Sequence, residues 1–405
     1  MKIINGGVTA PKGFTAVGIY AGLKKNPNKK DMALIYSECI CECAGVYTSN
    51  KVKGEPLKIT MEHLEDGKAQ AVIINSGNAN TCTGIEGLEN ARKMTKLTAE
   101  GLNIKEKDVI VASTGVIGMQ LDMGKIENGI KDIVNKPTKQ GYITAREAIM
   151  TTDTVKKDIS IEIEIDGKKV VIGAMAKGSG MIHPNMCTML SFITTDINID
   201  ASLLKQSLKE SADISYNRIS IDGDTSTNDM VVILANGMAE NEKIVEKDSN
   251  YKLFKDALDF LNTEMAKKVA ADGEGATKLI ETKVIGAKTK EEAANISKTV
   301  TASSLVKTAM FGSDANWGRI LCAIGYSGEE IDPDKVDISF ESGKGYIDVC
   351  EKGVPLDFSE ETAKKILGEH DITIWIDLHE GQEEATTWGC DLSYEYVRIN
   401  GDYRS

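Results

Sequence analysis

The sequence is short of histidine, tryptophan and proline, and these scarcities bear on which classes of protein it can belong to. Its four histidines form no HExxH pattern, and no CxxC pair occurs, so the usual zinc-site spacings are missing. Only seven prolines are spread over 405 residues, and the sequence contains no low-complexity tract or long linker. We therefore expect no bound metal, and composition does not reveal a domain boundary.

Positive charges are outnumbered by negative ones, with 48 Lys and Arg residues against 61 Asp and Glu residues. The formal net charge is −13, which argues against a nucleic-acid partner, because such a partner requires a basic surface. No stretch approaches the roughly 18–20 apolar residues that cross a bilayer, so we expect no membrane partner. The N-terminal MKIINGGVTAPKGF has no apolar segment like that of a secretory signal. The expected location is the cytoplasm.

The eight cysteines are scattered through the chain, which does not favour a disulfide framework in a protein of this size. Cys39, Cys41 and Cys43 alternate with other residues, and on a strand this spacing places all three on one face. Without metal-ligand partners, they are interpreted as small apolar residues of a strand.

Alternating and continuous apolar segments predict several strands. Four isoleucines alternate with polar residues in 159–165, and Asp166-Gly167 then supplies a two-residue turn, so a β-hairpin is expected. Segments 336–340 and 372–378 alternate in the same way. The continuous apolar run at 230–237 is typical of a strand covered on both faces.

Helical spacing is clearest from Tyr251 to Val269, where apolar residues recur every three or four positions, with Ser249 or Asn250 as the expected cap. Weaker patterns predict helices over 86–102 and 201–214, and the lysine-rich 286–300 is interpreted as a solvated surface stretch. Helices and strands alternate irregularly, without a βαβ rhythm. The predicted fold class is therefore α+β, with a layered architecture.

Glycine-rich polar clusters that could present backbone N–H groups and hydroxyls to a ligand occur at widely separated positions. They are SGNANTCTG (76–84), ASTGVIG (112–118), MTTDT (150–154), KGSGMIHPNMCTML (177–190), DGDTSTND (222–229), DGEGATK (272–278) and FGSDANWGR (311–319). Each alone is also compatible with a plain turn. The KGSG segment lacks the GxxxxGK[ST] order of a phosphate loop, and no GxGxxG lies in a βαβ context.

Nucleophilic catalysis fits the segment 177–190 better. A threonine hydroxyl needs a base, and no histidine occurs in a recognisable triad order. One solution is the α-amine of the threonine itself, whose ordinary pKa of about 7.7–8.0 suits a base near neutral pH. Thr188 acquires a free amine only if the preceding peptide bond is cut. The neighbouring His183 is interpreted as a loop residue rather than as a catalytic base.

The same segment resembles the self-processing site of the ornithine acetyltransferase family, enzymes of the cyclic arginine pathway. Further matching motifs follow in family order: GGVTAPKGF (6–14), SGNAN (76–80), STGVIG (113–118), TTDT (151–154), DGEGATK (272–278), NWGRI (316–320) and CDLSYEYVRING (390–401). The resemblance therefore covers essentially the whole chain. It implies the layered α/β sandwich shared with self-processing aminopeptidases, of the N-terminal-nucleophile type.

The resemblance implies self-cleavage between Cys187 and Thr188, giving an α chain of residues 1–187 and a β chain of residues 188–405 that form one intertwined unit. Thr188 would then accept the acetyl group of N-acetylornithine and pass it to glutamate. No cofactor is implied; acetyl-CoA is a candidate second acetyl donor, which would make the enzyme bifunctional. The family also implies a heterotetramer of two α and two β chains.

Site residues follow from the matching motifs. Thr114 and Gly115 resemble the oxyanion hole of the family, and further positions resemble its substrate-binding residues: Thr151, Lys177, Thr188, Glu274, Asn400 and Ser405. A carboxylate such as that of Glu274 suits the amine of ornithine, and Lys177 suits a substrate carboxylate. Cys187 departs from the alanine that is more frequent in the family.

Three alternatives remain at this point. Cys187 could itself be a catalytic thiol, although no base for it is evident. The chain could be a self-processed aminopeptidase or amide hydrolase of related fold, with water as the acceptor. It could also be a non-catalytic protein whose glycine-rich loops bind an amino acid.

Overall fold

The structure is a computed structural model, and it describes residues 1–183 and 189–402. Within these residues, nine strands form one sheet and seven form another. The larger sheet contains β1 (Lys2–Ile4), β2 (Phe14–Ile19), β3 (Met32–Tyr47), β4 (Lys68–Asn78), β5 (Val109–Val116), β6 (Lys157–Ile165), β7 (Lys168–Lys177), β8 (Leu190–Thr195) and β10 (Met230–Ala235). Its helices are α1 (Glu55–His63), α2 (Gly84–Leu102), α3 (Met123–Ile133), α4 (Tyr142–Ala148), α5 (Ala201–Ile214) and α6 (Ser249–Ala271).

The larger sheet is folded into two layers that share the long strand β3. The order of its strands is β1-β6-β7-β8-β10-β3-β4-β5, with β2 also paired to β3. Strand β3 pairs with β4 through its first half and with β10 through its second, and its register with β4 shifts between Tyr36 and Cys41. Such an irregularity bends a strand, so β2, β4 and β5 form a first layer, and β10, β8, β7, β6 and β1 form a second.

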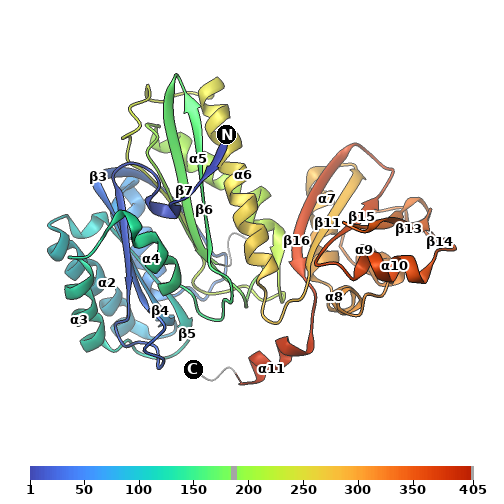
Figure 1. Cartoon of the computed structure of the whole chain (residues 1–405), viewed down its shortest axis with the longest axis horizontal. Helices are drawn as coiled ribbons and strands as arrows, with labels where there is room; N and C mark the ends of the chain where they lie inside the picture. The colour runs from blue at the N-terminus through green and yellow to red at the C-terminus, as the bar shows by residue number, and fades with distance from the viewer. Residues whose placement is uncertain (184–188, 403–405) are drawn as a thin grey trace.

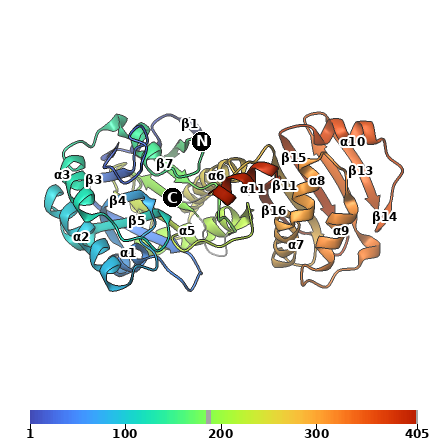
Figure 2. The same cartoon turned by 90° about the horizontal axis from the view of Figure 1, so that it is seen from below.

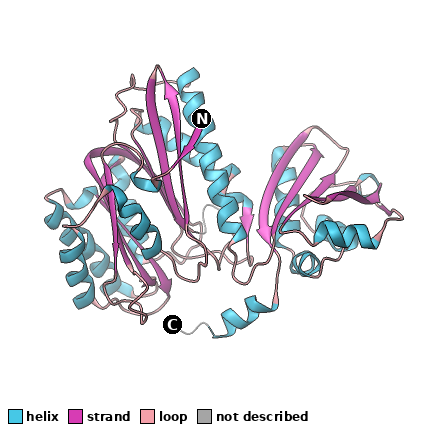
Figure 3. Ribbon diagram, viewed as in Figure 1, coloured by secondary structure: helices cyan, strands magenta, loops and turns pink. Residues whose placement is uncertain are grey.

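Burial confirms the two layers, because neighbouring residues on a strand enter different cores. Val72 of β4 and Phe192 of β8 belong to one core between the layers. The next residue on each strand points outward: Ile73 packs with α2 and α3 residues, and Ile193 packs with α5 and α6 residues. Figure 3 shows the resulting order of helix, strand, strand and helix layers. The predicted layered α+β fold is confirmed.

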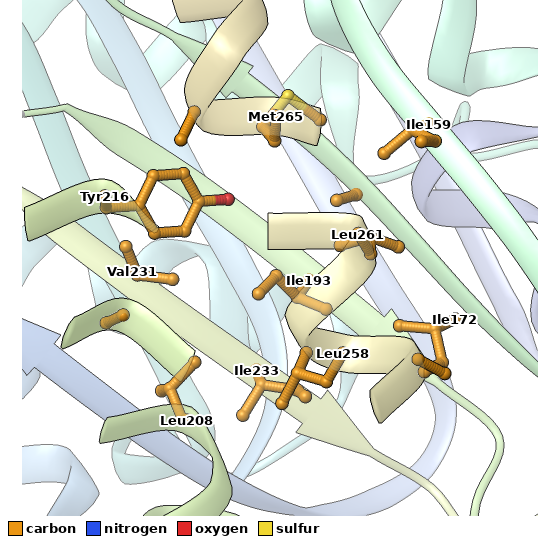
Figure 4. Close-up of a cluster of buried hydrophobic side chains, with 14 of the residues drawn as sticks. Ile159, Ile172, Ile193, Leu208, Tyr216, Val231, Ile233, Leu258, Leu261 and Met265 are labelled. Carbon is orange, nitrogen blue, oxygen red and sulfur yellow. The ribbon is translucent and has the colours of Figure 1, made fainter. Parts of the chain in front are cut away.

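The core beneath α5 and α6 contains the apolar face of the helix that was predicted from Tyr251 to Val269. All six apolar residues that predicted it are buried: Tyr251, Phe254, Leu258, Leu261, Met265 and Val269. In Figure 4, Leu258 and Leu261 lie over Ile193 and Ile233 of the second layer, with Tyr216 at the side. The predicted cap was wrong: Asp248 is the N-cap, and its carboxylate accepts the Tyr251 N–H at 2.8 Å.

The predicted hairpin and strands are confirmed. Strands β6 and β7 pair from Ile165 and Lys168 onward, and Asp166 and Gly167 both have positive φ angles (50° and 72°), as a type I′ turn requires. The run at 230–237 contains β10, which lies between β8 and β3 and is buried throughout. Cys41 and Cys43 are buried apolar residues of β3, as expected, whereas Cys39 is only partly buried and lies outside this core.

The second sheet forms a separate layer with helices on one face (Figure 1). Its order is β14-β13-β12-β15-β11-β16-β9. The strands are β9 (Ile219–Ser220), β11 (Leu279–Ala287), β12 (Asp337–Ser342), β13 (Gly345–Glu351), β14 (Val354–Pro355), β15 (Asp371–Asp377) and β16 (Glu383–Cys390). The helices are α7 (Lys290–Ala302), α8 (Ser304–Phe311), α9 (Trp317–Gly325), α10 (Glu360–Leu367) and α11 (Tyr394–Asp402).

One expectation in this half was wrong. Segment 286–300, interpreted as a solvated stretch, contains most of α7, and Ala293, Ile296 and Val300 enter the core of the second sheet. Their spacing of three and four residues is that of an amphipathic helix. Helix α11 turns back from this half toward the first one, as Figures 1 and 2 both show. It thereby brings Asn400 toward the loop that follows β7.

Candidate active site

A small cavity lies where the ends of several strands meet, and it contains two of the predicted site residues. Its volume is about 30 Å³, enough for one or two water-sized groups. Among the described residues it is lined by Thr114, Lys177, Gly180, Met181, Met189, Leu190, Ser226, Asn228 and Asp229. We call it the Thr114 cavity.

The strand pairing explains why these residues meet. Lys177 at the end of β7 pairs with Leu190 at the start of β8, and Met230 at the start of β10 pairs with the same Leu190. Asn228 then bridges to the other layer, because its side-chain amide donates to the Ser113 carbonyl at 3.0 Å and to the Ala79 carbonyl at 2.7 Å. Thr114 therefore faces the cavity from the first layer, and Lys177 faces it from the second.

Gly115 occupies a position that only glycine fits. Its φ is +133°, and a Cβ atom would lie 2.4 Å from the Gly77 carbonyl carbon on the neighbouring strand β4. The β4–β5 register is irregular here, after Gly77. The backbone after Thr114 thus departs from the regular hydrogen-bond pattern of the sheet at the edge of the cavity. The role of Thr114 and Gly115 as an oxyanion hole stays a prediction.

A Gly115→Ala substitution is expected to damage the site without removing a functional side chain. The added methyl group must push the β5 backbone away from Gly77. Any hydrogen-bond donor at Thr114 or Gly115 would then no longer point at the oxygen that it stabilises. Loss of one such donor costs about 10²–10³ in kcat. Steady-state kinetics of the acetyl transfer that the resemblance implies would measure this. The control is Gly325→Ala in α9, where a Cβ meets nothing within 4 Å; an unchanged rate in both proteins would contradict the importance of this backbone.

A buried ion network anchors the loops around Lys177. Asp153 accepts hydrogen bonds from Gly178 N (2.7 Å), Thr151 N (2.9 Å) and Lys157 Nζ (2.8 Å). Burial alone would raise the pKa of Asp153, but the Lys177 and Lys157 cations hold it well below its ordinary value. Thr151 is therefore joined through Asp153 to the residue that follows Lys177.

Lys157 is fully buried and also binds Asp272, at the start of the DGEGATK cluster. Asp272 in turn accepts the Thr154 and Val155 N–H groups. The Ser179 hydroxyl donates to the Asp272 carbonyl at 2.6 Å. One network thus ties the TTDT, KGSG and DGEGATK motifs together.

Glu274 and Asn400, from distant parts of the sequence, are in contact. The Asn400 side-chain amide donates to Glu274 Oε2 at 2.7 Å. Glu274 N donates to the Ser179 carbonyl at 2.8 Å, and a Cβ on Gly180 would lie 2.4 Å from the Glu274 carboxyl carbon. Glu274 therefore packs against a residue that lines the Thr114 cavity. Helix α11 supplies Asn400 to this cluster.

The structure thus brings Thr114 and Lys177 into one cavity, with Gly115 adjacent to Thr114 and Glu274 packed against the lining residue Gly180. Thr151 and Asn400 do not line the cavity; they are joined to it through Asp153 and Glu274. Cys187, Thr188 and Ser405 lie outside the described residues. His183 does not line the Thr114 cavity: its Nδ1 lies 3.0 Å from Ser220 Oγ, and burial, with Lys298 nearby, lowers its pKa to about 4. It is therefore neutral at pH 7.

Several residues of this site were missed from the sequence. Asp153, Asp272 and Asp229 lie inside the glycine-rich clusters quoted above but were not singled out, because aspartate is also an ordinary turn residue. Asp222 was missed for the same reason; its carboxylate accepts Met181 N at 2.6 Å and Ile182 N at 2.8 Å. No motif or pattern in the sequence marked Lys157 as a residue of the site. No group of three or more His, Cys, Asp or Glu residues suited to a metal occurs in the described part of the chain.

Fold and site together define a layered α+β protein whose glycine-rich loops converge on a cavity with a lysine, a threonine and a buried carboxyl group. The family model described as the ArgJ family matches residues 15–405. The chain belongs to this family, and the resemblance to the ornithine acetyltransferase family is confirmed. It is an enzyme of arginine biosynthesis.

Two relatives match this chain over its full length, and a solved structure matches about half of it. The arginine biosynthesis bifunctional protein ArgJ of Caldanaerobacter subterraneus is 51% identical over 405 residues, covering 100% of both chains. The bifunctional protein ArgJ 1 of Clostridium acetobutylicum is 52% identical, covering 100% of this chain and 99% of its own. The crystal structure of the Bacillus halodurans bifunctional protein argJ has 49% identity and a TM-score of 0.51, and covers 53% of this chain and 100% of its own. No helix among residues 1–183 and 189–402 has the length and hydropathy of a membrane span.

Proposed function

We propose that this chain transfers the acetyl group of N2-acetylornithine to glutamate through an acetyl ester on Thr188, after cutting itself between Cys187 and Thr188. The observation that carries the proposal is the Thr114 cavity. Residues on both sides of the expected cut contribute to its lining: Lys177, Gly180 and Met181 before it, and Met189 and Leu190 after it. The chain that follows Thr188 therefore starts at this cavity.

Self-cleavage is a rearrangement of the peptide bond. The Thr188 hydroxyl attacks the Cys187 carbonyl, the C–N bond breaks, and the resulting ester is hydrolysed by water. This leaves a carboxyl group on Cys187 and a free amine beside the hydroxyl of Thr188. The Bacillus halodurans polypeptide is consistent with such a cut, because it is matched over its whole length yet spans just over half of this chain, as residues 188–405 would.

The two halves would remain joined after the cut. Strands β7 and β8 pair over six residues, from Ile172 with Thr195 to Lys177 with Leu190. The buried Lys157 of the α chain binds Asp272 of the β chain, and Asn228 of the β chain donates to Ser113 of the α chain. These contacts support one intertwined unit, and we propose that two such units form the αβ heterotetramer.

In the transfer cycle, the Thr188 hydroxyl attacks the acetyl carbonyl, its proton passes to the α-amine, and ornithine leaves with that proton. The amine of glutamate then attacks the ester and restores the hydroxyl. Glu274 suits the side-chain ammonium of ornithine, and Lys177 suits a substrate carboxylate. Because the relatives are named bifunctional proteins, acetyl-CoA is proposed as a second acetyl donor.

The test compares ornithine release with and without glutamate. An acetyltransferase requires the acceptor, so release should be slow without glutamate and rise strongly with its concentration, in ping-pong kinetics. Equal release without an acceptor would favour the amide hydrolase. Binding of N-acetylornithine without turnover or cleavage would favour a ligand-binding protein.

The Glu274–Asn400 contact gives a further prediction. An Asn400→Ala substitution removes the hydrogen bond that holds the Glu274 carboxylate in place. The KM for N-acetylornithine is therefore expected to rise about tenfold, which corresponds to a loss of about 1.4 kcal/mol of binding free energy. The kcat should change much less, because Asn400 does not touch the acetyl group. Asn295→Ala is the control, since Asn295 also donates to a glutamate (Glu329, 2.6 Å) but on an exposed surface. An unchanged KM would show that Asn400 has no part in substrate binding.

A further inference from the structure

Asp229 is a buried carboxyl group for which the transfer cycle described above has no use. It immediately precedes β10, and it is one of the residues that line the Thr114 cavity, although it is only 3% exposed. Its backbone is held on two sides. Thr48 N donates to the Asp229 carbonyl at 3.1 Å, and the next residue, Met230, donates its N–H to the Met189 carbonyl at 2.9 Å. Asp229 is thus fixed next to Met230, which is hydrogen-bonded to Met189, the second residue after the expected cut.

One oxygen of this carboxyl group is unsatisfied. Among the described residues, Oδ2 of Asp229 has no hydrogen-bond partner, although it is fully buried. A buried polar atom without a partner is costly, and native proteins keep such an atom where a ligand or water supplies the missing bond. The cavity of about 30 Å³ beside it has room for such a group.

The protonation state of Asp229 follows from its surroundings. Burial raises its pKa well above the ordinary value, and the Ser226 and Thr48 hydroxyls and the Lys177 cation only partly oppose this. Lys177 is the charged side chain that the structure places near Asp229, and no ion pair joins the two within the described parts of the chain. An unpaired buried carboxylate is much less stable than the neutral acid, so these surroundings favour the protonated form of Asp229.

We propose that Asp229 is a further catalytic residue, whose protonated Oδ2 donates a hydrogen bond to the acyl oxygen of the substrate in the Thr114 cavity. This proposal rests on the proposed acetyl transfer. Thr114 faces the same cavity from the opposite layer, so the two residues can contact one small group from both sides. When the acyl carbon is attacked, its oxygen gains negative charge, and a donor in a buried site stabilises that charge more than it stabilises the ground state.

The experiment compares Asp229→Asn with Asp229→Ala in fully cleaved protein, with the cut fraction measured first on a denaturing gel. Asparagine keeps an N–H donor at this position, so kcat should stay within about tenfold of wild type. Alanine removes the donor, and kcat should fall about 10²–10³-fold with little change in KM. Wild-type activity should fall as rising pH removes the Asp229 proton, and Asp229→Asn should not show that loss.

The matched control is Asp196→Asn. Asp196 is also fully buried and has a raised pKa, which burial causes, but it follows the far end of β8 and accepts the Val171 and Lys12 N–H groups instead. This variant should keep the wild-type kcat and pH profile. If the role of Asp229 were merely structural, Asp229→Asn and Asp196→Asn would have the same effect on kcat and on its pH profile.

Protein stability supplies a readout that does not depend on activity. The unfolded chain releases the Asp229 proton at a lower pH than the folded chain, so this residue destabilises the fold progressively as pH rises above the ordinary pKa of aspartate. Asp229→Asn should therefore gain in Tm relative to wild type between pH 4 and pH 8. If the Tm of Asp229→Asn shows no such gain, Asp229 is not protonated in the folded protein and the proposal is wrong.

The outcomes separate the two proposals. If wild-type protein transfers no acetyl groups, the proposed function is wrong. If it transfers them and Asp229→Ala keeps kcat within threefold, only the role of Asp229 is wrong. A folded, cleaved Asp229→Asn protein that is as slow as Asp229→Ala would also overturn it, because a donor would then not suffice.

Discussion

The Thr188→Ala protein is expected to remain one polypeptide of 405 residues and to transfer no measurable acetyl groups. Without the hydroxyl, nothing attacks the Cys187 carbonyl, so no amine is released and no acetyl ester can form. Loss of a catalytic nucleophile lowers kcat by about 10⁴-fold or more. A denaturing gel and an assay of ornithine release from N-acetylornithine with glutamate would measure both effects.

Cys187→Ala is the matched control on the other side of the same peptide bond. Alanine is small and supports the same cleavage, so this protein should cut itself and transfer acetyl groups at nearly the wild-type rate. An inactive but cleaved Cys187→Ala protein would instead support a catalytic thiol. A Thr188→Ala protein that is cut and active would contradict the proposed mechanism outright.

A Lys157→Met substitution should lower the free energy of unfolding by about 3–5 kcal/mol, because it leaves two buried carboxylates without their shared cation. Asp153 and Asp272 are both nine-tenths or more buried, and methionine fills the space of the lysine without its charge. The uncut Thr188→Ala background suits the measurement, since a single chain then unfolds with denaturant.

Lys156→Met controls for the loss of one lysine. Lys156 is adjacent in the sequence, but its side chain is 49% exposed and pairs with Glu147 at the surface. Its removal should change the free energy of unfolding by less than about 1 kcal/mol. A Lys157→Met protein as stable as the Lys156→Met protein would contradict the view that this network anchors the loops.

The sequence predicted elements whose signal is local. The isoleucines of 159–165 with Asp166-Gly167 define a hairpin without reference to the rest of the chain, and the stripe from Tyr251 to Val269 defines α6 in the same way. Helix α7 was missed because its many charged residues masked the spacing of Ala293, Ile296 and Val300. The cap of α6 was misplaced because Asp248, Ser249 and Asn250 are all favoured capping residues.

Other features arise only in three dimensions. No periodicity marks the bend of β3 after Tyr36, yet this bend stacks the two layers and brings Ser113 to Asn228. The motifs indicated Thr114 and Lys177, which do line one cavity. The sequence could not show that Asp229 is buried without a partner for Oδ2, because burial depends on the whole fold. Nor could it show that Lys157 joins Asp153 to Asp272, because Asp272 lies 115 positions from Lys157 in the chain.

The central claim is that Thr188, at the start of a self-cut chain, carries the acetyl group. Intact-mass spectrometry of wild-type protein, incubated with N-acetylornithine and no glutamate, tests this most directly. The predicted spectrum contains a fragment 1–187 of unchanged mass and a fragment 188–405 that is heavier by one acetyl group, which added glutamate removes. A fully active preparation with only the uncut mass of 405 residues, or with the acetyl group on fragment 1–187, would contradict it.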